Sequence, residues 1–365
     1  ENSTLYNIWS SAYATIYRAN AVIEGLGKST LERTDTDTFT GEALFVRAFC
    51  HFYLLNAFGD IPLVTTTDYR INNKVGRTPK DEVYRQIKDD LKAAIGMLGD
   101  GYGHAGGERV RVNRWTAEAL LSRAHLYAGD YADAEELASS VIAQTHLYEI
   151  EPDLDGVFMK NSKEAIWQLF PVGTTINTYE AYNAINFLAT RASTFTLSDR
   201  FLQEFEIGDR RREHWVKDVQ LANGEIVPCA FKYKILRTEL SEPKAEYSMV
   251  MRLAEVHLIR AEARLMASDY QGALADINLL RLRHGKLPPL ELEDHDAVMQ
   301  AIERERMVEF FYEWGHRWFD LKRWGKAVQA IGVFDPDFAE KHTHYPLPER
   351  EMHANPSLTP QNLGY

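Results

Sequence analysis

The chain contains 365 residues, of which 45% are hydrophobic and 26% are charged, and its formal net charge is −12. This length can bury a large core, and the composition is typical of a globular protein. We expect no nucleic-acid partner, because phosphate backbones are bound by clustered lysine and arginine, and the basic runs at 210–212 and 322–323 are short. The two cysteines, Cys50 and Cys229, provide no disulfide framework.

The first third of the chain predicts helices. Apolar residues recur at helical spacing over 5–25, and a further helix is expected to open at Thr78-Pro79. Between them, residues 41–58 are apolar around almost the whole helical circumference, which is typical of a helix buried on every side. We expect Thr38 or Thr40 to cap the start of this helix and Gly59 to end it.

Two segments share a pattern of paired helices joined by a tight turn, at 115–144 and 251–284. A shift of 139 residues places Ala124 on Ala263 and Asp130 on Asp269. Small residues at a helix crossing and a short turn are typical of tetratricopeptide repeats. The spacing is far longer than one such repeat, so the pattern predicts separate helical hairpins with other structure between them.

The helical periodicity fades at 145–246, where short β-like runs at 165–170 and 226–235 flank one helical piece at 198–206. Long irregular chain inside a compact protein is more often functional than not. Periodicity returns with helices at 297–314 and 317–330, and the four prolines of residues 345–365 predict an extended tail.

No set of residues indicates catalysis or a cofactor. Glu305, Glu309 and Glu313 lie one turn apart on the same predicted helix, where an ion-paired or solvated face is favoured over a hydrolytic pair. His342 and His344 lack further ligands at a convincing spacing, so we expect no metal site. We therefore expect no enzyme activity and no cofactor.

Aromatic residues in irregular chain indicate a binding surface instead. Tyr179, Tyr182 and Trp215 lie among polar residues, and aromatic rings can stack on the apolar faces of sugars. The alternative is that these rings fill the core, which we favour for Trp167 because it lies on a predicted strand.

Four blocks of sequence carry a family resemblance. They are Glu42-Ala43 with Arg47-Ala48-Phe49 and Gly59-Asp60-Ile61-Pro62-Leu63-Val64; residues 114–129 (RWTAEALLSRAHLYAG); Gly208-Asp209-Arg210; and Glu305-Arg306 through residues 318–324 (WFDLKRW) to the tail at 345–365. The chain resembles the SusD/RagB family of nutrient-binding lipoproteins of the bacterial outer membrane. It departs from the family pattern at Leu363, where proline is usual, and in its short irregular middle.

The resemblance implies the capture of an oligosaccharide at the cell surface and its delivery to a partner SusC-like TonB-dependent transporter. It also implies an N-terminal lipid anchor on the extracellular face of the outer membrane; Glu1 is not a natural start residue, so we expect this anchor to be missing from the present sequence. By position, the resemblance points to Tyr69, Arg70 and Asn72 after the central helix, and to Tyr179, Tyr182 and Trp215 in the middle.

These observations predict a mainly α-helical single domain. Tetratricopeptide-like hairpins at 1–145 and 246–335 form the scaffold, an irregular insert at 146–245 with a few short strands carries the ligand site, and residues 336–365 form an extended tail. Three alternatives remain open: a peptide ligand within the same family, a helical-repeat adaptor that binds another protein, and, as the weakest, a glycosidase.

Overall fold

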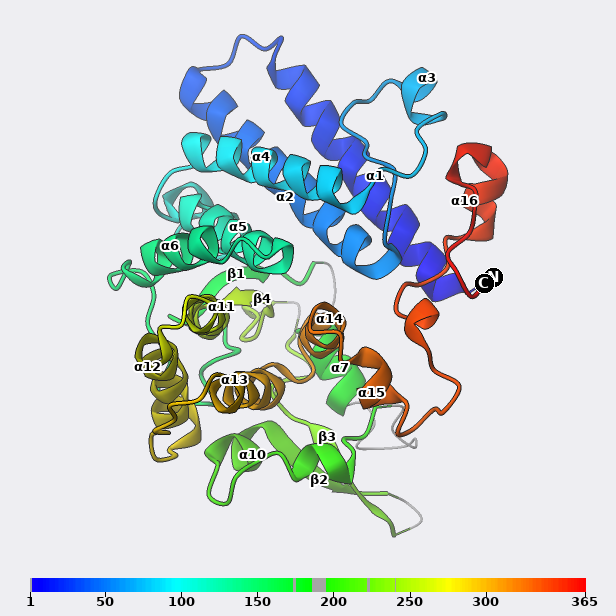
Figure 1. Ribbon diagram of the computed structural model, residues 1–365. Coiled ribbons are helices and arrows are strands. Elements are labelled where there is room, and N and C mark those ends of the chain that lie inside the picture. The colour runs from blue at the N-terminus through cyan, green and yellow to red at the C-terminus, as the bar shows by residue number, and fades with distance from the viewer. Residues whose placement is uncertain (1, 173–174, 186–194, 222–223, 240) are drawn as a thin grey trace. The chain divides into compact units, whose positions relative to one another are not determined.

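The computed structural model describes residues 2–172, 175–185, 195–221, 224–239 and 241–365 (Figure 1). Helices predominate and the strands are few and short, which confirms the predicted fold class. The chain divides into two compact units. Unit 1 comprises residues 1–100, 112–130 and 318–365, and unit 2 comprises residues 101–111 and 131–317. The expectation of a single domain stays a prediction, and each unit is described by itself.

Unit 1 is built on four long helices that pack in chain order: α1 (Ser3–Leu26), α2 (Arg33–Phe58), α4 (Lys80–Met97) and α5 (Arg114–Ala128). Helix α2 packs against both α1 and α4, and its predicted role as a buried central helix is confirmed by the burial of Phe45, Phe52 and Phe58 (Figure 1). Its one buried guanidinium, Arg47, binds the carboxylate of Asp90 on α4 through two hydrogen bonds of 2.6 and 2.8 Å. The charge of Arg47, in the middle of this apolar helix, is thus neutralised by Asp90.

The start of α2 differs from the prediction. The helix begins at Arg33, so Thr38 and Thr40 lie within it and neither caps it. The Thr38 hydroxyl donates to the carbonyl of Thr34 at 2.8 Å, one helical turn earlier. This bond satisfies the hydroxyl inside the helix, and the N-terminal threonines therefore extend α2 where they were expected to start it. Gly59 ends the helix at a φ of +77°, as predicted.

Several short elements complete unit 1: α3 (Tyr69–Asn72), α15 (Ala327–Ile331), η3 (Glu340–His342), α16 (Glu349–Ala354) and η4 (Pro356–Leu358).

The prediction of a single helix at 317–330 is wrong, because α14 (His316–Arg323) stops before Gly325, whose φ is +67°. The tail is not extended throughout either. Helix α16 forms in it because Pro348 precedes a first turn that contains Glu349 and Glu351, and acidic residues stabilise a helix N-terminus.

Unit 2 is organised around α11 (Leu253–Met266), which packs against α6 (Tyr131–Ile142), α12 (Tyr270–Leu280) and α13 (His295–Phe310). The predicted hairpin of α11 and α12 is confirmed, with Ala263 buried within it. Ala124 on α5 is equally buried in unit 1. A short 3-10 helix, η1 (Gly103–Ala105), and a π-helical turn, η2 (Arg281–Gly285), also belong to unit 2.

The irregular part of unit 2 contains two antiparallel ribbons. β1 (Ala165–Leu169) pairs with β4 (Ser248–Arg252), and β2 (Val216–Gln220) pairs with β3 (Ile226–Ala230). Both predicted strands are therefore present, although the second ends five residues early. The helix predicted at 198–206 is reduced to α9 (Asp199–Leu202). Two further helices, α7 (Tyr179–Ile185) and α10 (Arg210–Trp215), escaped prediction because six or seven residues are too few to show a helical period.

Candidate functional site

The three candidate residues of unit 1 lie on α3, at the end of the loop that follows α2. Glu24 of α1 holds this loop by accepting hydrogen bonds of 2.8 Å from the Thr66 hydroxyl and the Thr67 backbone, and bonds to Thr67 and Thr66 lower the pKa of its carboxyl. The Asn72 amide donates to the carbonyl of Thr66 at 2.8 Å. The loop is therefore a defined platform.

The side chains on this platform differ in what they offer to a ligand. Tyr69 is 70% exposed and presents its ring to solvent. Arg70 is exposed as well, but its guanidinium is bound to both carboxylate oxygens of Asp68, the N-cap of α3. The amide nitrogen of Asn72 is already used within the loop. Tyr69 is thus the group of the three that is best placed for stacking.

In unit 2, α7 presents Tyr179 and Tyr182, one turn apart. Tyr179 is 74% exposed and Tyr182 is partly buried. Between them, the Glu180 carboxylate accepts a hydrogen bond of 2.6 Å from the hydroxyl of Ser248, and the Glu180 carbonyl accepts one of 3.1 Å from Tyr312. Ser248 is the β4 residue that pairs with Leu169 of β1. These contacts fix α7 against the end of the β1–β4 ribbon.

The end of this ribbon adds a ring that the sequence analysis missed. Phe170 is 50% exposed and packs edge-to-face on Tyr247, with ring centroids 5.3 Å apart. The Lys160 ammonium lies 5.3 Å from the centre of the Tyr247 ring and forms an ion pair with Glu108. We call Phe170, Tyr179 and Tyr182 the aromatic patch. One feature of the sequence could have indicated the position of Phe170. Pro171 follows it and cannot donate a hydrogen bond between strands, so the strand ends there and the Phe170 ring lies at the end of the ribbon.

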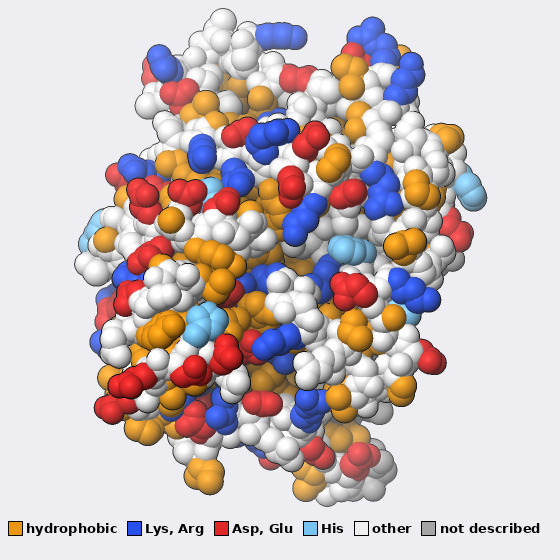
Figure 2. Space-filling model, viewed as in Figure 1, with side chains coloured by type: hydrophobic (Ala, Val, Ile, Leu, Met, Phe, Trp, Pro, Cys, Tyr) orange, Lys and Arg blue, Asp and Glu red, His pale blue; other side chains and the backbone are white. Residues whose placement is uncertain are grey.

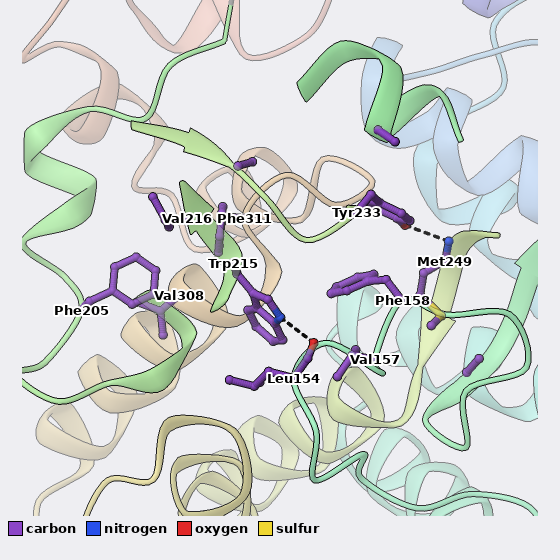
Figure 3. Close-up of a cluster of buried hydrophobic side chains, with 13 residues drawn as sticks. Leu154, Val157, Phe158, Phe205, Trp215, Val216, Tyr233, Met249, Val308 and Phe311 are labelled. Carbon is purple, nitrogen blue, oxygen red and sulfur yellow. Dashed lines mark hydrogen bonds between the residues drawn. The ribbon is translucent and has the colours of Figure 1, made fainter. Parts of the chain in front are cut away.

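Trp215 does not belong to a binding surface, and its prediction as a ligand platform is wrong. The side chain is 0% exposed, and its indole nitrogen donates to the carbonyl of Leu154 at 3.0 Å (Figure 3). Its ring packs edge-to-face on Phe158 within a cluster of buried side chains. The physical reason is that Trp215 ends α10 and points inward, while the polar residues beside it in sequence point out. For Trp167 we predicted a position in the core, and its burial confirms this prediction.

The three glutamates of α13 and the segment after it form part of a buried ionic network, which we define by Arg211, Arg252, Lys232, His284 and the carboxylates around them. Arg211 contacts Glu305 at 2.5 Å and Glu309 at 2.8 Å. Arg252 contacts Glu309 at 2.6 Å and Glu313 at 2.9 Å, and Lys232 contacts Glu313 at 2.5 Å. The predicted face is therefore ion-paired and not solvated. Its carboxylates are shielded from solvent, so their arrangement is that of a structural network and not of an open cleft.

The carboxylates of this network are already compensated by cations of the protein itself. Glu164, His284 and Glu309 have ligand atoms close to one another, but the Arg252 guanidinium lies 2.8 Å from Glu164 and 2.6 Å from Glu309. Burial alone would raise the pKa of Glu309, yet His284 and Arg252 hold it well below its usual value. The charge that a metal would supply is already present.

The stability of unit 2 should depend on pH through His284, whose Nδ1 lies 2.8 Å from Glu309. Burial lowers the pKa of His284, but the carboxylates of Glu309 and Glu164 outweigh it and raise the pKa from 6.5 to about 9. A raised folded-state pKa stabilises the fold fully below about pH 6.5, and this contribution is lost as the pH rises towards 9. We expect the free energy of urea unfolding of the native protein to exceed that of His284→Gln most at pH 6 and least at pH 9.5. A difference that stays constant over this range would contradict the assignment.

The surface carries charges of both signs, and the length and apolarity of the helices decide whether they could span a membrane. Figure 2 shows lysine and arginine side chains interspersed with aspartate and glutamate over the visible face. Within the described ranges, no helix combines the length and the apolarity that crossing a lipid bilayer requires.

Comparison with known proteins identifies the family. Residues 1–126 match the family model described as "Starch-binding associating with outer membrane", and residues 237–338 match the model of the SusD family. The chain belongs to the SusD/RagB-like family. It is similar to SusD-like protein P2 of Formosa agariphila, with 27% identity over all of this chain and 81% of that protein.

Solved structures of SusD-like proteins share the fold. A SusD superfamily protein from Parabacteroides distasonis superposes with a TM-score of 0.84 at 23% identity, covering 99% of this chain and 86% of that one. A structure described as a laminarin-binding SusD-like protein gives a TM-score of 0.81 at 24% identity, covering 98% and 86%. At the level of the SusD/RagB-like family, carbohydrate binding and association with the outer membrane are therefore supported.

Proposed function

We propose that this protein binds an oligosaccharide through the aromatic patch and delivers it to a TonB-dependent transporter of the outer membrane. In this proposal the protein is held by an N-terminal lipid on the extracellular face and breaks no bond in its ligand. The family supports the ligand class and the membrane; the transporter, the anchor and the absence of catalysis are the parts that we add. A SusC-like transporter is the expected partner.

The observation that carries the proposal is an exposed aromatic surface with polar neighbours. Tyr179 and Phe170 offer ring faces and edges to solvent, and Glu180 and Lys160 supply an acceptor and a donor nearby. Sugar rings combine apolar faces with hydroxyls, so a ligand of this class can use both kinds of contact. Tyr69 of unit 1 is another exposed ring, and we propose it as a separate candidate surface for a glycan.

Binding of this kind should be weak. An exposed surface excludes less water than an enclosed pocket, and a protein that passes on its ligand benefits from fast dissociation. We expect dissociation constants in the micromolar to millimolar range, which correspond to about −8 to −4 kcal/mol.

The test is isothermal titration calorimetry with soluble starch and laminarin. Because Tyr179 is highly exposed, Tyr179→Ala should retain the fold and weaken binding of the recognised glycan by roughly tenfold, and Phe170→Ala should do the same through loss of a stacking surface. Tyr17→Ala is the matched control, since Tyr17 is an exposed tyrosine on α1 and not part of the patch.

The outcomes separate the alternatives. Loss of binding in the patch variants but not in Tyr17→Ala supports the proposal. Unchanged affinity in both patch variants would place the site elsewhere, and Tyr69→Ala then tests the α3 platform. Binding of neither glycan, with binding of a peptide library, would replace the carbohydrate by a peptide ligand.

A further inference from the structure

Unit 1 contains a charged cavity of about 350 Å³ that the proposed function does not use. It lies where the end of α2, the start of α4 and the last turn of α14 meet the segment after η3. Its walls include the aromatic rings of Tyr84, Tyr127 and Phe319. Gly59 closes one side, and a side chain there would come within 3.2 Å of the His344 ring. The turn after α2 is thus closely fitted to this cavity.

Three cations line the cavity without a carboxylate partner. Neither the Lys80 nor the Lys322 ammonium has a carboxylate within 4 Å in the part of the chain that the structure describes. Lys322 donates to the carbonyl of Asn56 and lies 5.6 Å from the centre of the Trp318 ring. The Lys80 ammonium lies 5.6 Å from the centre of the Tyr84 ring. Both ammonium groups therefore retain unused donors.

Arg77 is the third cation. Its guanidinium donates to the carbonyls of Asp60 at 3.1 Å and Pro360 at 2.8 Å, and to the side-chain oxygen of Asn362. These partners are neutral, so they orient the guanidinium without cancelling its charge.

The other charged groups of the wall reduce the positive potential but do not remove it. Arg323 forms an ion pair with Asp320 at 2.8 Å, and that pair is neutral overall. Asp60 and Glu340 also line the cavity, and Asp60 accepts a hydrogen bond from the Lys80 backbone at 3.0 Å. Three cations that form no ion pair thus face two carboxylates, so positive charge remains in excess. Burial, followed by the charge of Lys80, lowers the pKa of Lys322 to about 8, and the opposing effect of Glu340 is smaller.

We propose that this cavity binds an oxyanion, the carboxylate, sulfate or phosphate group of a small molecule. Lys80, Lys322 and Arg77 supply charge-assisted hydrogen bonds, which are the strong interactions available to such groups. A wider hollow of about 850 Å³ shares Arg77 and His344 with the cavity, so the uncharged body of the molecule has room beside its anionic end. This site lies in unit 1, so the proposal is tested independently of the aromatic patch in unit 2.

The experiment is calorimetry of the full chain with sodium sulfate, sodium phosphate and sodium glucuronate. Glucose at matched ionic strength in sodium chloride is the neutral control. We expect at least one oxyanion to bind and glucose not to bind. Glucuronate alone would identify a sugar acid as the ligand, and sulfate or phosphate would identify an inorganic or ester-borne group.

Variants test the named cations. Lys322→Met and Lys80→Met should each weaken oxyanion binding at least tenfold, because each removes one charge and keeps a side chain of similar length. Lys92→Met, an exposed position on the same helix as Lys80, should leave binding unchanged. If Lys322→Met fails to fold by circular dichroism, Lys80→Met decides alone, because Lys80 is exposed at the first residue of α4.

Two results would overturn the proposal. The first is the absence of any oxyanion binding above the chloride control. The second is unchanged binding in both Lys80→Met and Lys322→Met, since an anion held elsewhere would not depend on these side chains. If Lys322→Met does not fold, unchanged binding in Lys80→Met overturns the proposal by itself.

Discussion

Replacing Arg252 with methionine is expected to destabilise the protein by about 3–5 kcal/mol, because it removes one partner of a buried charge network. The Arg252 guanidinium is almost fully buried and contacts Glu164, Glu309 and Glu313 at 2.6–2.9 Å. Methionine fills similar space but carries no charge. The three carboxylates would then remain in the interior with fewer cations, and each would have to be protonated or hydrated at a cost.

The measurement is urea unfolding at pH 7, followed by circular dichroism. Arg33→Met is the matched control, because Arg33 is an exposed arginine whose ion pair with Asp37 at 3.4 Å lies on the surface of α2. It should change the midpoint little, as exposed pairs contribute little. If Arg252→Met unfolds at the same urea concentration as the native protein, the network does not stabilise unit 2.

Replacing Trp215 with alanine is expected to cost about 3–5 kcal/mol of stability, the usual range for deleting a large buried aromatic side chain. The ring is fully enclosed and packs on Phe158 (Figure 3). The two ring centroids are 5.7 Å apart, and the Lys232 ammonium lies 4.6 Å from the centre of the Trp215 ring. Alanine would leave a cavity at the centre of this cluster and an unsatisfied carbonyl at Leu154.

Thermal unfolding separates this structural role from a role in binding. Trp215→Phe should recover much of the loss, since it restores most of the packing and lacks only the indole hydrogen bond. Glycan affinity measured well below the melting temperature should be retained in Trp215→Phe. A Trp215→Ala protein that melts like the native one but fails to bind would show that the tryptophan touches the ligand after all.

The central helix and the α11–α12 hairpin could be read from sequence because their signals are local and long. Eighteen residues with few polar positions specify a buried helix, and the spacing of Ala263 and its neighbours specifies a helix crossing. The family blocks at 42–64 and 305–324 are equally local, and for this reason the fold class and the family were correctly predicted. Helix ends were less accurate, because threonines near position 38 suit both a cap and a helix interior.

The candidate site was only partly predictable, and the reason is burial. Tyr179 and Trp215 look alike in sequence, since each is an aromatic residue among polar neighbours, yet one is 74% and the other 0% exposed. Short helices such as α7 and α10 show no period from which an inward face can be read. Phe170 became part of the patch through the pairing of β1 with β4, a contact between residues about 80 positions apart.

The amino-acid sequence by itself determined the helical scaffold and the family, because each rests on patterns within a few helical turns. The tertiary structure alone decided which aromatic rings face solvent, which glutamates are neutralised by Arg211 and Arg252, and which lysines share a cavity without forming an ion pair. The physical reason is that exposure and charge pairing depend on contacts between residues far apart in the chain, such as Lys80 and Lys322, which no local pattern encodes.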